Sequence, residues 1–265
     1  MVHLDEAGRG MAWTELRAPP EVLDAWVEHA WIERFPDPPP SRIWKIVPDP
    51  SPHLLVHHRK ERRRVRLVGP RSRAVNVSVG DRRWTVGIRL RPGTLPALTG
   101  LTARELTDRS ARPGMLYGAV GREWENRIGA APTPTEALHR AFGFLRQILP
   151  DVHRVDWKVR LLLRSDPSAP GLRVGGIARG AGISRRALHE AVSHAVGLSP
   201  KATLSIRRLF RVLRAGLRCQ TPNWSRIAVD SGYHDGPHLI RDFQHFLGEP
   251  PTVWRARAGA DLYKP

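Results

Sequence analysis

Cysteine and lysine are scarce in this chain of 265 residues, and long apolar runs are missing. The single cysteine, Cys219, excludes an intrachain disulfide and a cysteine-rich zinc site, and it favours a reducing compartment. No apolar run approaches the roughly 20 residues that a membrane-spanning helix needs. The N-terminal stretch MVHLDEAGRG lacks the pattern of a signal peptide. We therefore expect a soluble, cytoplasmic protein with no membrane partner.

Signs of enzymatic chemistry are also missing. The sequence has no phosphate-binding glycine loop, dinucleotide fingerprint or Ser/His/Asp arrangement. His53, His57 and His58 resemble a metal cluster only superficially, because no carboxylate lies at a suitable spacing. A DNA-repair alkyltransferase would need an activated cysteine, but no Pro-Cys-His context surrounds Cys219. We therefore expect no enzyme, no metal and no cofactor.

Positive charge is abundant. Lys and Arg number 43 against 25 Asp and Glu, which gives a formal net charge of +18, and only five of the basic residues are lysines. Such a charge favours polyanionic partners, and arginine suits phosphate and guanine contacts. A GC-rich genome would also enrich arginine, and the charge is divided almost evenly between residues 1–150 and 151–265. The charge alone therefore does not locate a binding site.

Residues 1–150 are predicted to form a β-rich domain, a barrel or sandwich with flanking helices. Short segments rich in β-branched and aromatic residues alternate with Pro, Gly and Asp at roughly ten-residue spacing. These predicted strands are Ser41–Val47, His53–His57, Arg64–Val68, Ala74–Val79 and Arg83–Leu90. Trp26, Trp44 and Trp84 either line a ligand pocket or form plain core.

A helix is predicted to begin after Thr133, where Thr133 is an N-cap, Pro134 occupies the first helical position and Glu136 completes a capping box. Its apolar residues at helical spacing form either core or a dimer seam. After Pro150 strand patterns give way to helical periodicity, so residues 151–265 are predicted to form a second, all-α domain.

The C-terminal part contains an internal repeat. Ile177–Pro200 reads IARGAGISRRALHEAVSHAVGLSP, and Ile227–Pro251 reads IAVDSGYHDGPHLIRDFQHFLGEPP. Both begin Ile-Ala, place a glycine five residues later and end in Gly-x-[Ser/Pro]-Pro. Two copies at nearly constant spacing are a stronger signal than either copy alone.

Each copy has the pattern of a helix-turn-helix. Ala178 and Ala228 allow two helices to cross closely, and Gly182 and Gly232 tolerate the positive φ of a tight turn. Ser184 and Asp235 would cap the second helices. The mini-cores are predicted from Ile177, Ile183 and Leu188 in the first copy, and Ile227, Tyr233, Leu239 and Phe243 in the second.

Residues 200–217 between the copies are predicted to form one long helix with an apolar stripe. Arginines occupy much of its remaining surface, among them Arg207 and Arg208. They either face solvent or contact DNA phosphates, and the helix could hold two reading helices about one DNA turn, ~34 Å, apart.

These segments resemble the DNA-binding domain of AraC/XylS-type transcriptional regulators. The strongest carrier is GYHDGPHLIRDFQHFLGEPPTVWR, supported by the first copy and by the RRL of Arg207–Leu209. The segments IVPDPSPHLLVH and VGIRLRPGTLPALTGLTARELTDRS resemble a sensor-like domain found ahead of such domains. The resemblance implies a bacterial transcription factor with an N-terminal sensing or dimerisation domain.

The resemblance places Arg185, Arg186 and His189 toward the bases, and Arg186 could bind guanine bidentately. Glu190 departs from the family, which often has arginine at that position. The second reading helix presents Gly236, Pro237, Ile240, Arg241 and Gln244. Gly236 and Pro237 have little or no hydrogen-bonding reach, which predicts positioning more than base reading, and Arg241 is the best polar contact candidate. The complete set of predicted DNA-contacting residues is Ser184, Arg185, Arg186, His189, Arg207, Arg208, Asp235, Gly236, Arg241 and Gln244.

The sequence thus predicts a sequence-specific DNA-binding regulator modulated by a small molecule through its N-terminal domain. Its expected partners are double-stranded DNA and an unidentified effector, and RNA polymerase and a second copy of the chain fit the same function. The alternative is a protein that binds DNA without specificity, or a repair protein with an appended helix-turn-helix pair.

Overall fold

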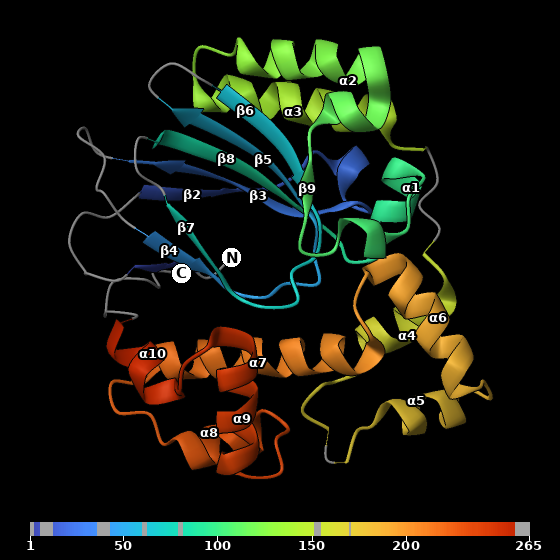
Figure 1. Ribbon diagram of the computed structural model, residues 1–265, viewed down its shortest axis with the longest axis vertical. Helices are drawn as coiled ribbons and strands as arrows, with labels where there is room; N and C mark the ends of the chain where they lie inside the picture. Colours follow the sequence, from blue (N-terminus) through green and yellow to red (C-terminus); the bar gives the residue numbers. More distant parts are fainter. Residues whose placement is uncertain are drawn as a thin grey trace.

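The structure is a computed structural model that describes residues 3–5, 13–35, 43–59, 63–78, 82–150, 155–169 and 171–257. The N-terminal region contains the strands together with short helices and the two longer helices α2 and α3, and the C-terminal region is helical (Figure 1). The strands are β1 (His3–Asp5), β2 (Trp13–Arg17), β3 (Val27–Arg34), β4 (Ile43–Ile46), β5 (His53–Arg59), β6 (Arg63–Val68), β7 (Val75–Ser78), β8 (Arg82–Leu90) and β9 (Ser110–Ala111). The helices are η1 (Glu21–Leu23), α1 (Leu95–Thr99), η2 (Ala103–Leu106), α2 (Pro113–Gly129), α3 (Pro134–Ile148), α4 (Trp157–Arg164), α5 (Val174–Gly180), α6 (Arg185–Val196), α7 (Pro200–Arg218), α8 (Trp224–Asp230), α9 (Gly236–Leu247) and α10 (Pro251–Arg257). Within the described ranges no helix is both long enough and apolar enough to cross a membrane.

The strands form two antiparallel sheets. The larger has the order β2-β3-β8-β5-β6-β9 and the smaller the order β1-β4-β7. The five strands predicted between Ser41 and Leu90 correspond to β4–β8. Among the described residues both sheets are open, so the N-terminal region is strand-rich as predicted but does not close into the barrel that was one of the two predicted forms.

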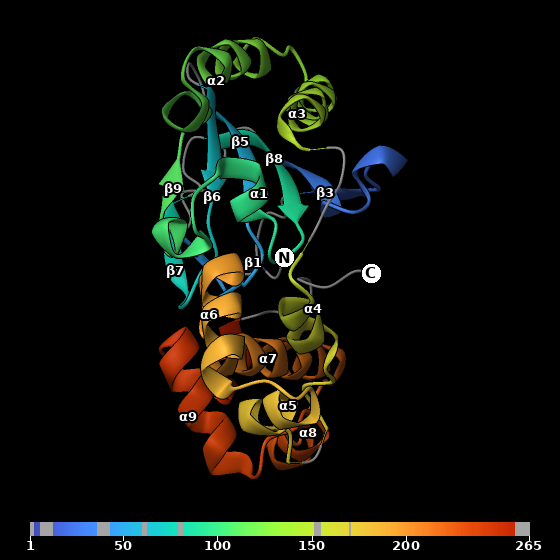
Figure 2. The same ribbon diagram turned by 90° about the vertical axis from the view of Figure 1, so that its right-hand side faces the viewer.

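Helices α2 and α3 cover one face of the larger sheet (Figures 1 and 2). Thr133 caps α3 as predicted, because its hydroxyl accepts the backbone N–H of Glu136 at 3.1 Å. The Glu136 side chain does not complete the predicted capping box and instead pairs with Arg140. The apolar stripe of α3, including Leu138 and Leu145, is buried against the sheet, so this stripe is core rather than a dimer seam.

The C-terminal helices contain two further hydrophobic clusters. One joins α4, α5, α6 and the start of α7, and the other joins α7 to α8, α9 and α10. Val47 is buried in the second of these clusters and Ala74 packs against it, although both belong to the N-terminal region. The strand-rich and helical regions therefore share part of a core.

Candidate nucleic-acid interface

The first helix-turn-helix unit consists of α5 and α6. Gly182 in the turn has a φ of +67°, a conformation that glycine adopts without steric cost. The N–H of Ile183 closes the turn by donating to the carbonyl of Ala178 at 3.0 Å. Ser184 then caps α6, since its hydroxyl accepts the N–H of Ala187 at 3.0 Å. These positions confirm the predicted turn and cap.

The second unit, α8 and α9, repeats this geometry. Gly232 has a φ of +89°, and the N–H of Tyr233 donates to the carbonyl of Ala228 at 3.0 Å. Asp235 caps α9 by accepting the N–H of His238 at 2.7 Å. The predicted mini-core residues of both units are buried or half-buried in the two C-terminal clusters.

The recognition helices α6 and α9 lie on the same side of the helical layer (Figure 2), and α7 runs between the two units (Figure 1). Aligning the turns pairs residues of α6 with residues of α9. Arg186 corresponds to Pro237, His189 to Ile240 and Glu190 to Arg241, and all six side chains are exposed. The two helices therefore expose residues at equivalent positions, but the residue types at those positions differ.

On α6 the exposed surface is polar. Arg186 is 88% exposed, and its Nε donates to the Glu190 carboxylate at 2.7 Å. The Nδ1 of His189 lies 3.5 Å from the Ser193 hydroxyl. Arg185 lies beside α5, where a Cβ on Gly175 would meet its stem at 3.5 Å. The arginine that the sequence assigned to guanine is thus paired with the acidic residue that departs from the family.

On α9 the exposed surface is largely apolar near its N-terminus. Pro237 is exposed and Ile240 is 49% exposed. The Gln244 amide donates to the Gly248 carbonyl at 3.2 Å, toward the C-terminal end of the helix. Arg241 supplies an exposed cation on this surface.

The α7 arginines singled out by the sequence are half-buried and contact neighbouring elements. Arg207 donates to the carbonyl of Leu162 at 3.0 Å, and burial lowers the pKa of its guanidinium while Asp166 opposes that shift. Arg208 donates to the carbonyl of Gly232 at 3.4 Å and lies 5.5 Å from the centre of the Tyr233 ring. Both residues therefore brace the helical units, a role that the sequence did not indicate.

Residues of the N-terminal region bind the C-terminal ends of both recognition helices. At α6, the hydroxyl of Thr107 donates to the carbonyl of Gly197 at 3.0 Å. At α9, the N–H of Ala74 donates to the carbonyl of Phe246 at 2.8 Å. The Lys45 ammonium donates to the carbonyl of Leu247 and pairs with the Glu249 carboxylate. Local sequence patterns carry no signal for these contacts, because the partners lie far apart along the chain.

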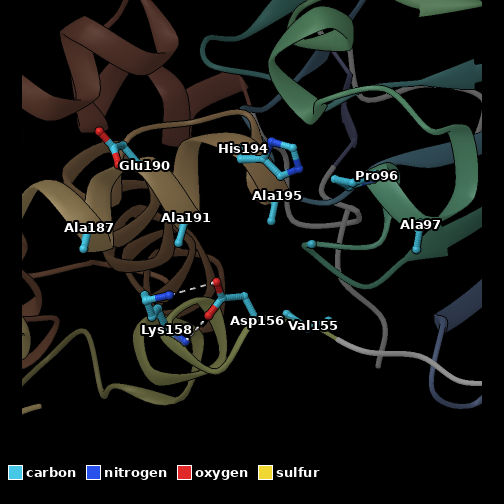
Figure 3. A pocket seen from close by; sticks show the side chains of 11 residues that line it. Pro96, Ala97, Val155, Asp156, Lys158, Ala187, Glu190, Ala191, His194 and Ala195 are labelled. Atoms are coloured by element: carbon cyan, nitrogen blue, oxygen red, sulfur yellow. Dashed lines mark hydrogen bonds and ion pairs between the residues drawn. The ribbon is translucent and has the colours of Figure 1, made fainter. Parts of the chain in front are cut away.

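A cavity of about 460 Å³ lies between α1, the start of α4 and α6 (Figure 3). Its polar lining includes Asp156 and Lys158, which pair at 3.3 Å, together with Glu190 and His194 of α6. The complete lining is Gly93, Pro96, Ala97, Val155, Asp156, Lys158, Ala187, Glu190, Ala191, His194 and Ala195. Its walls therefore come from the N-terminal region, α4 and a recognition helix.

The three tryptophans considered for a ligand pocket do not line this cavity. Trp26 and Trp84 are buried in the main core of the N-terminal region. Trp44 packs separately against Phe35, with ring centroids 5.4 Å apart. The structure thus does not bring the three side chains together at one site.

Two family models match separate parts of the chain. A family model described as a domain of unknown function matches residues 15–112, and a model described as a helix-turn-helix domain matches residues 177–257. A comparison with curated proteins finds no match.

Solved structures similar to this chain include two transcriptional regulators and ToxT. A DNA-binding transcriptional dual regulator from Escherichia coli K-12 is 22% identical over 39% of this chain and 99% of that chain, with a TM-score of 0.34. An AraC-type regulator from Chromobacterium violaceum is 21% identical over 39% of this chain and 94% of that chain, with a TM-score of 0.33. Fatty-acid-bound ToxT from Vibrio cholerae is 13% identical over 99% of this chain and 96% of that chain, with a TM-score of 0.42.

The helix-turn-helix match spans both units, whose turns, caps and buried residues follow the pattern read from the sequence. Residues 177–257 are therefore an AraC-type helix-turn-helix domain.

Proposed function

We propose that this protein regulates transcription by binding one specific DNA site, with α6 and α9 in two adjacent major grooves. The observation that carries the proposal is the pair of equivalent units whose exposed helices lie on one side of the molecule. The 19 residues of α7 span about 28 Å, which is close to one turn of DNA. This separation suits two successive major grooves on one face of a duplex.

The residues of α6 supply direct base recognition in this proposal. Arg186 binds guanine through O6 and N7, and Arg185 and His189 contact neighbouring base edges or phosphates. Because Glu190 holds the Arg186 guanidinium in the free protein, DNA must replace that exposed ion pair. An exposed pair of this kind contributes at most about 1 kcal/mol, so its loss is a small cost.

Other predicted residues position the protein. Ser184 and Asp235 set the N-termini of the two recognition helices, while Gly236, Arg241 and Gln244 belong to the DNA-facing side of α9. Arg207 and Arg208 are also proposed to contact DNA phosphates, through the guanidinium N–H groups that do not donate to protein carbonyls. Removing a phosphate contact by Arg208→Ala should weaken binding to all sequences alike and lower the salt slope by about one. An unchanged salt slope would restrict Arg208 to bracing the second unit.

Residues 1–150 are proposed to sense an effector and to pass the signal to residues 151–265. The cavity beside α6 supports this role, because a molecule bound there would touch both a recognition helix and the N-terminal region. Filling the cavity with Ala97→Trp should change the affinity for specific DNA several-fold. Ala130→Trp, at an exposed position away from the cavity, is the matched control. Equal affinities of the two variants would argue against a signal that passes through the cavity.

The other proposed partners of the protein are RNA polymerase and a second copy of the chain.

The test of the proposed function is footprinting and gel shift with DNA upstream of the protein's own gene, at moderate salt. We expect a protected region that spans two major grooves on one face. Equal affinity for random and upstream DNA would replace the proposal with non-specific binding. Absence of any binding would exclude both functions.

A further inference from the structure

The exposed surface of α9 differs from that of α6 in a way that specifies what it can recognise. At the three outward positions where α6 carries Arg185, Arg186 and His189, α9 carries Gly236, Pro237 and Ile240. None of these three α9 side chains can donate or accept a hydrogen bond. A helix that reads bases through these positions must therefore read an apolar group.

Thymine provides the apolar group that the four bases present in the major groove. Its C5-methyl projects from the base edge, whereas the other groups on those edges are hydrogen-bond donors and acceptors. We propose that Ile240 determines specificity in the second half of the DNA site by contacting thymine methyl groups. This inference rests on the proposed function and extends it to the composition of one half-site.

The position of Ile240 supports this role more than its exposure does. Single exposed apolar side chains are common on protein surfaces. Ile240, however, lies one turn into the recognition helix, at the position equivalent to His189, and it is 49% exposed. Gly236 and Pro237 precede it without long side chains, so the helix N-terminus can approach the groove closely.

The polar residues of α9 leave this role to Ile240. The Gln244 amide is engaged with the Gly248 carbonyl at the other end of the helix. Asp235 is committed to capping the N–H of His238. Arg241, beside Ile240, suits a phosphate on the wall of the groove and would hold the helix at the depth that a methyl contact needs.

The experiment begins with selection from a pool of random duplexes by the full-length protein. We expect two preferred blocks about one helical turn apart. The block whose preference disappears in Arg186→Ala is assigned to α6, and the other block is assigned to α9. The second block is expected to contain thymines, and each is then replaced by deoxyuridine, which removes only the methyl group.

Each contacted thymine replaced in this way should weaken binding about fourfold, the equivalent of burying one methyl group. In Ile240→Ala the same replacement should have no further effect, because the contact is already gone. His189→Ala is the matched control at the equivalent position of α6, and there the deoxyuridine effect in the second block should persist. Ile240→Asn should shift the preference toward adenine.

Each result has one meaning. Two blocks with a methyl effect that depends on Ile240 support the inference. Two blocks in which the second is insensitive to deoxyuridine, or prefers guanine and cytosine, overturn it and leave the proposed function standing. Selection of no sequence at all overturns the proposed function itself. Deoxyuridine changes the DNA alone, so the methyl effect itself is measured with the unaltered protein. A methyl effect in the second block that persists in Ile240→Ala would also overturn the inference.

Discussion

The two helix-turn-helix units share their turn and cap geometry, but their exposed side chains differ in charge and polarity at equivalent positions. Both have a glycine of positive φ in the turn, a 3.0 Å hydrogen bond across it and a side chain that caps the second helix. Yet α6 exposes an arginine, a histidine and a glutamate where α9 exposes a proline, an isoleucine and an arginine. A few turn and cap positions thus determine the geometry, and the outward positions are free to acquire different recognition chemistry.

The interiors of the two units differ as well. The first packs aliphatic side chains, with Val192 at the position equivalent to Phe243 of the second. In the second unit the rings of Trp224, Phe243 and Trp254 lie within about 6 Å of one another. Gly216 of α7 makes room for this group, because a Cβ there would lie 2.7 Å from the Trp224 ring.

The largest expected effect tests this difference in packing. Phe243→Ala should lower the free energy of unfolding by about 3–5 kcal/mol, and Val192→Ala by about 2 kcal/mol, because the lost ring leaves the larger cavity. Both side chains are fully buried, so exposure does not bias the comparison. Denaturant unfolding of the two variants measures the two losses of unfolding free energy. Equal losses would show that the aromatic group does not stabilise its unit more than the aliphatic packing stabilises the other.

The next effect tests the difference in recognition. Arg186→Ala should weaken specific DNA binding by about 10- to 100-fold, the range of one bidentate contact to guanine, and relax preference in one block. Pro237→Ala, the equivalent change in α9, should alter binding far less. Binding titrations on the selected site check both variants. A uniform loss on all sequences would reassign Arg186 to a phosphate.

A smaller effect tests the opposite charges at equivalent positions. Glu190→Gln should strengthen binding several-fold, because it releases Arg186 and removes a negative charge from the DNA-facing surface. Arg241→Gln should weaken binding and lower the salt slope by about one. Titrations at several salt concentrations give both quantities. A loss of affinity in Glu190→Gln would instead indicate that the carboxylate contacts a base, for which cytosine N4 is the expected partner.

The smallest effect tests what the two units have in common. Ser184→Ala and Asp235→Ala each remove one N-cap hydrogen bond and should each lower the free energy of unfolding by about 1 kcal/mol. Thermal and denaturant unfolding measure the losses. A difference well above 1 kcal/mol between the two variants would mean that one cap has a second role.

The sequence predicts the helix-turn-helix units well because their determinants are local. Gly182, Ser184 and their counterparts act within one turn of the chain, so spacing alone reveals them. Strand β3 was not predicted, since Val27–Arg34 is a mostly buried strand without regular alternation. Helix α2 was also missed, because its glycines weaken the helical pattern and the chain bends at Gly118, where φ is +57°.

The candidate interface was predictable only in part. The outward residues of α6 and α9 follow from helical spacing, and the caps follow from residue type. The bracing contacts of Arg207 and Arg208 depend on where α4 and the second turn pack, which no local pattern specifies. For the same reason no sequence pattern indicated that Lys45, Ala74 and Thr107 bind the ends of the recognition helices.

Those three residues have a thermodynamic consequence. At the C-terminal end of each recognition helix, carbonyl groups accept hydrogen bonds from donors of the N-terminal region. A rearrangement of that region would therefore change the contacts of both helices at once. Binding free energies coupled in this way are reciprocal: a compound that tightens operator binding by a given factor must itself be held more tightly on operator DNA by that factor. Operator-bound protein is therefore the form in which an activating effector would be captured at the lowest concentration.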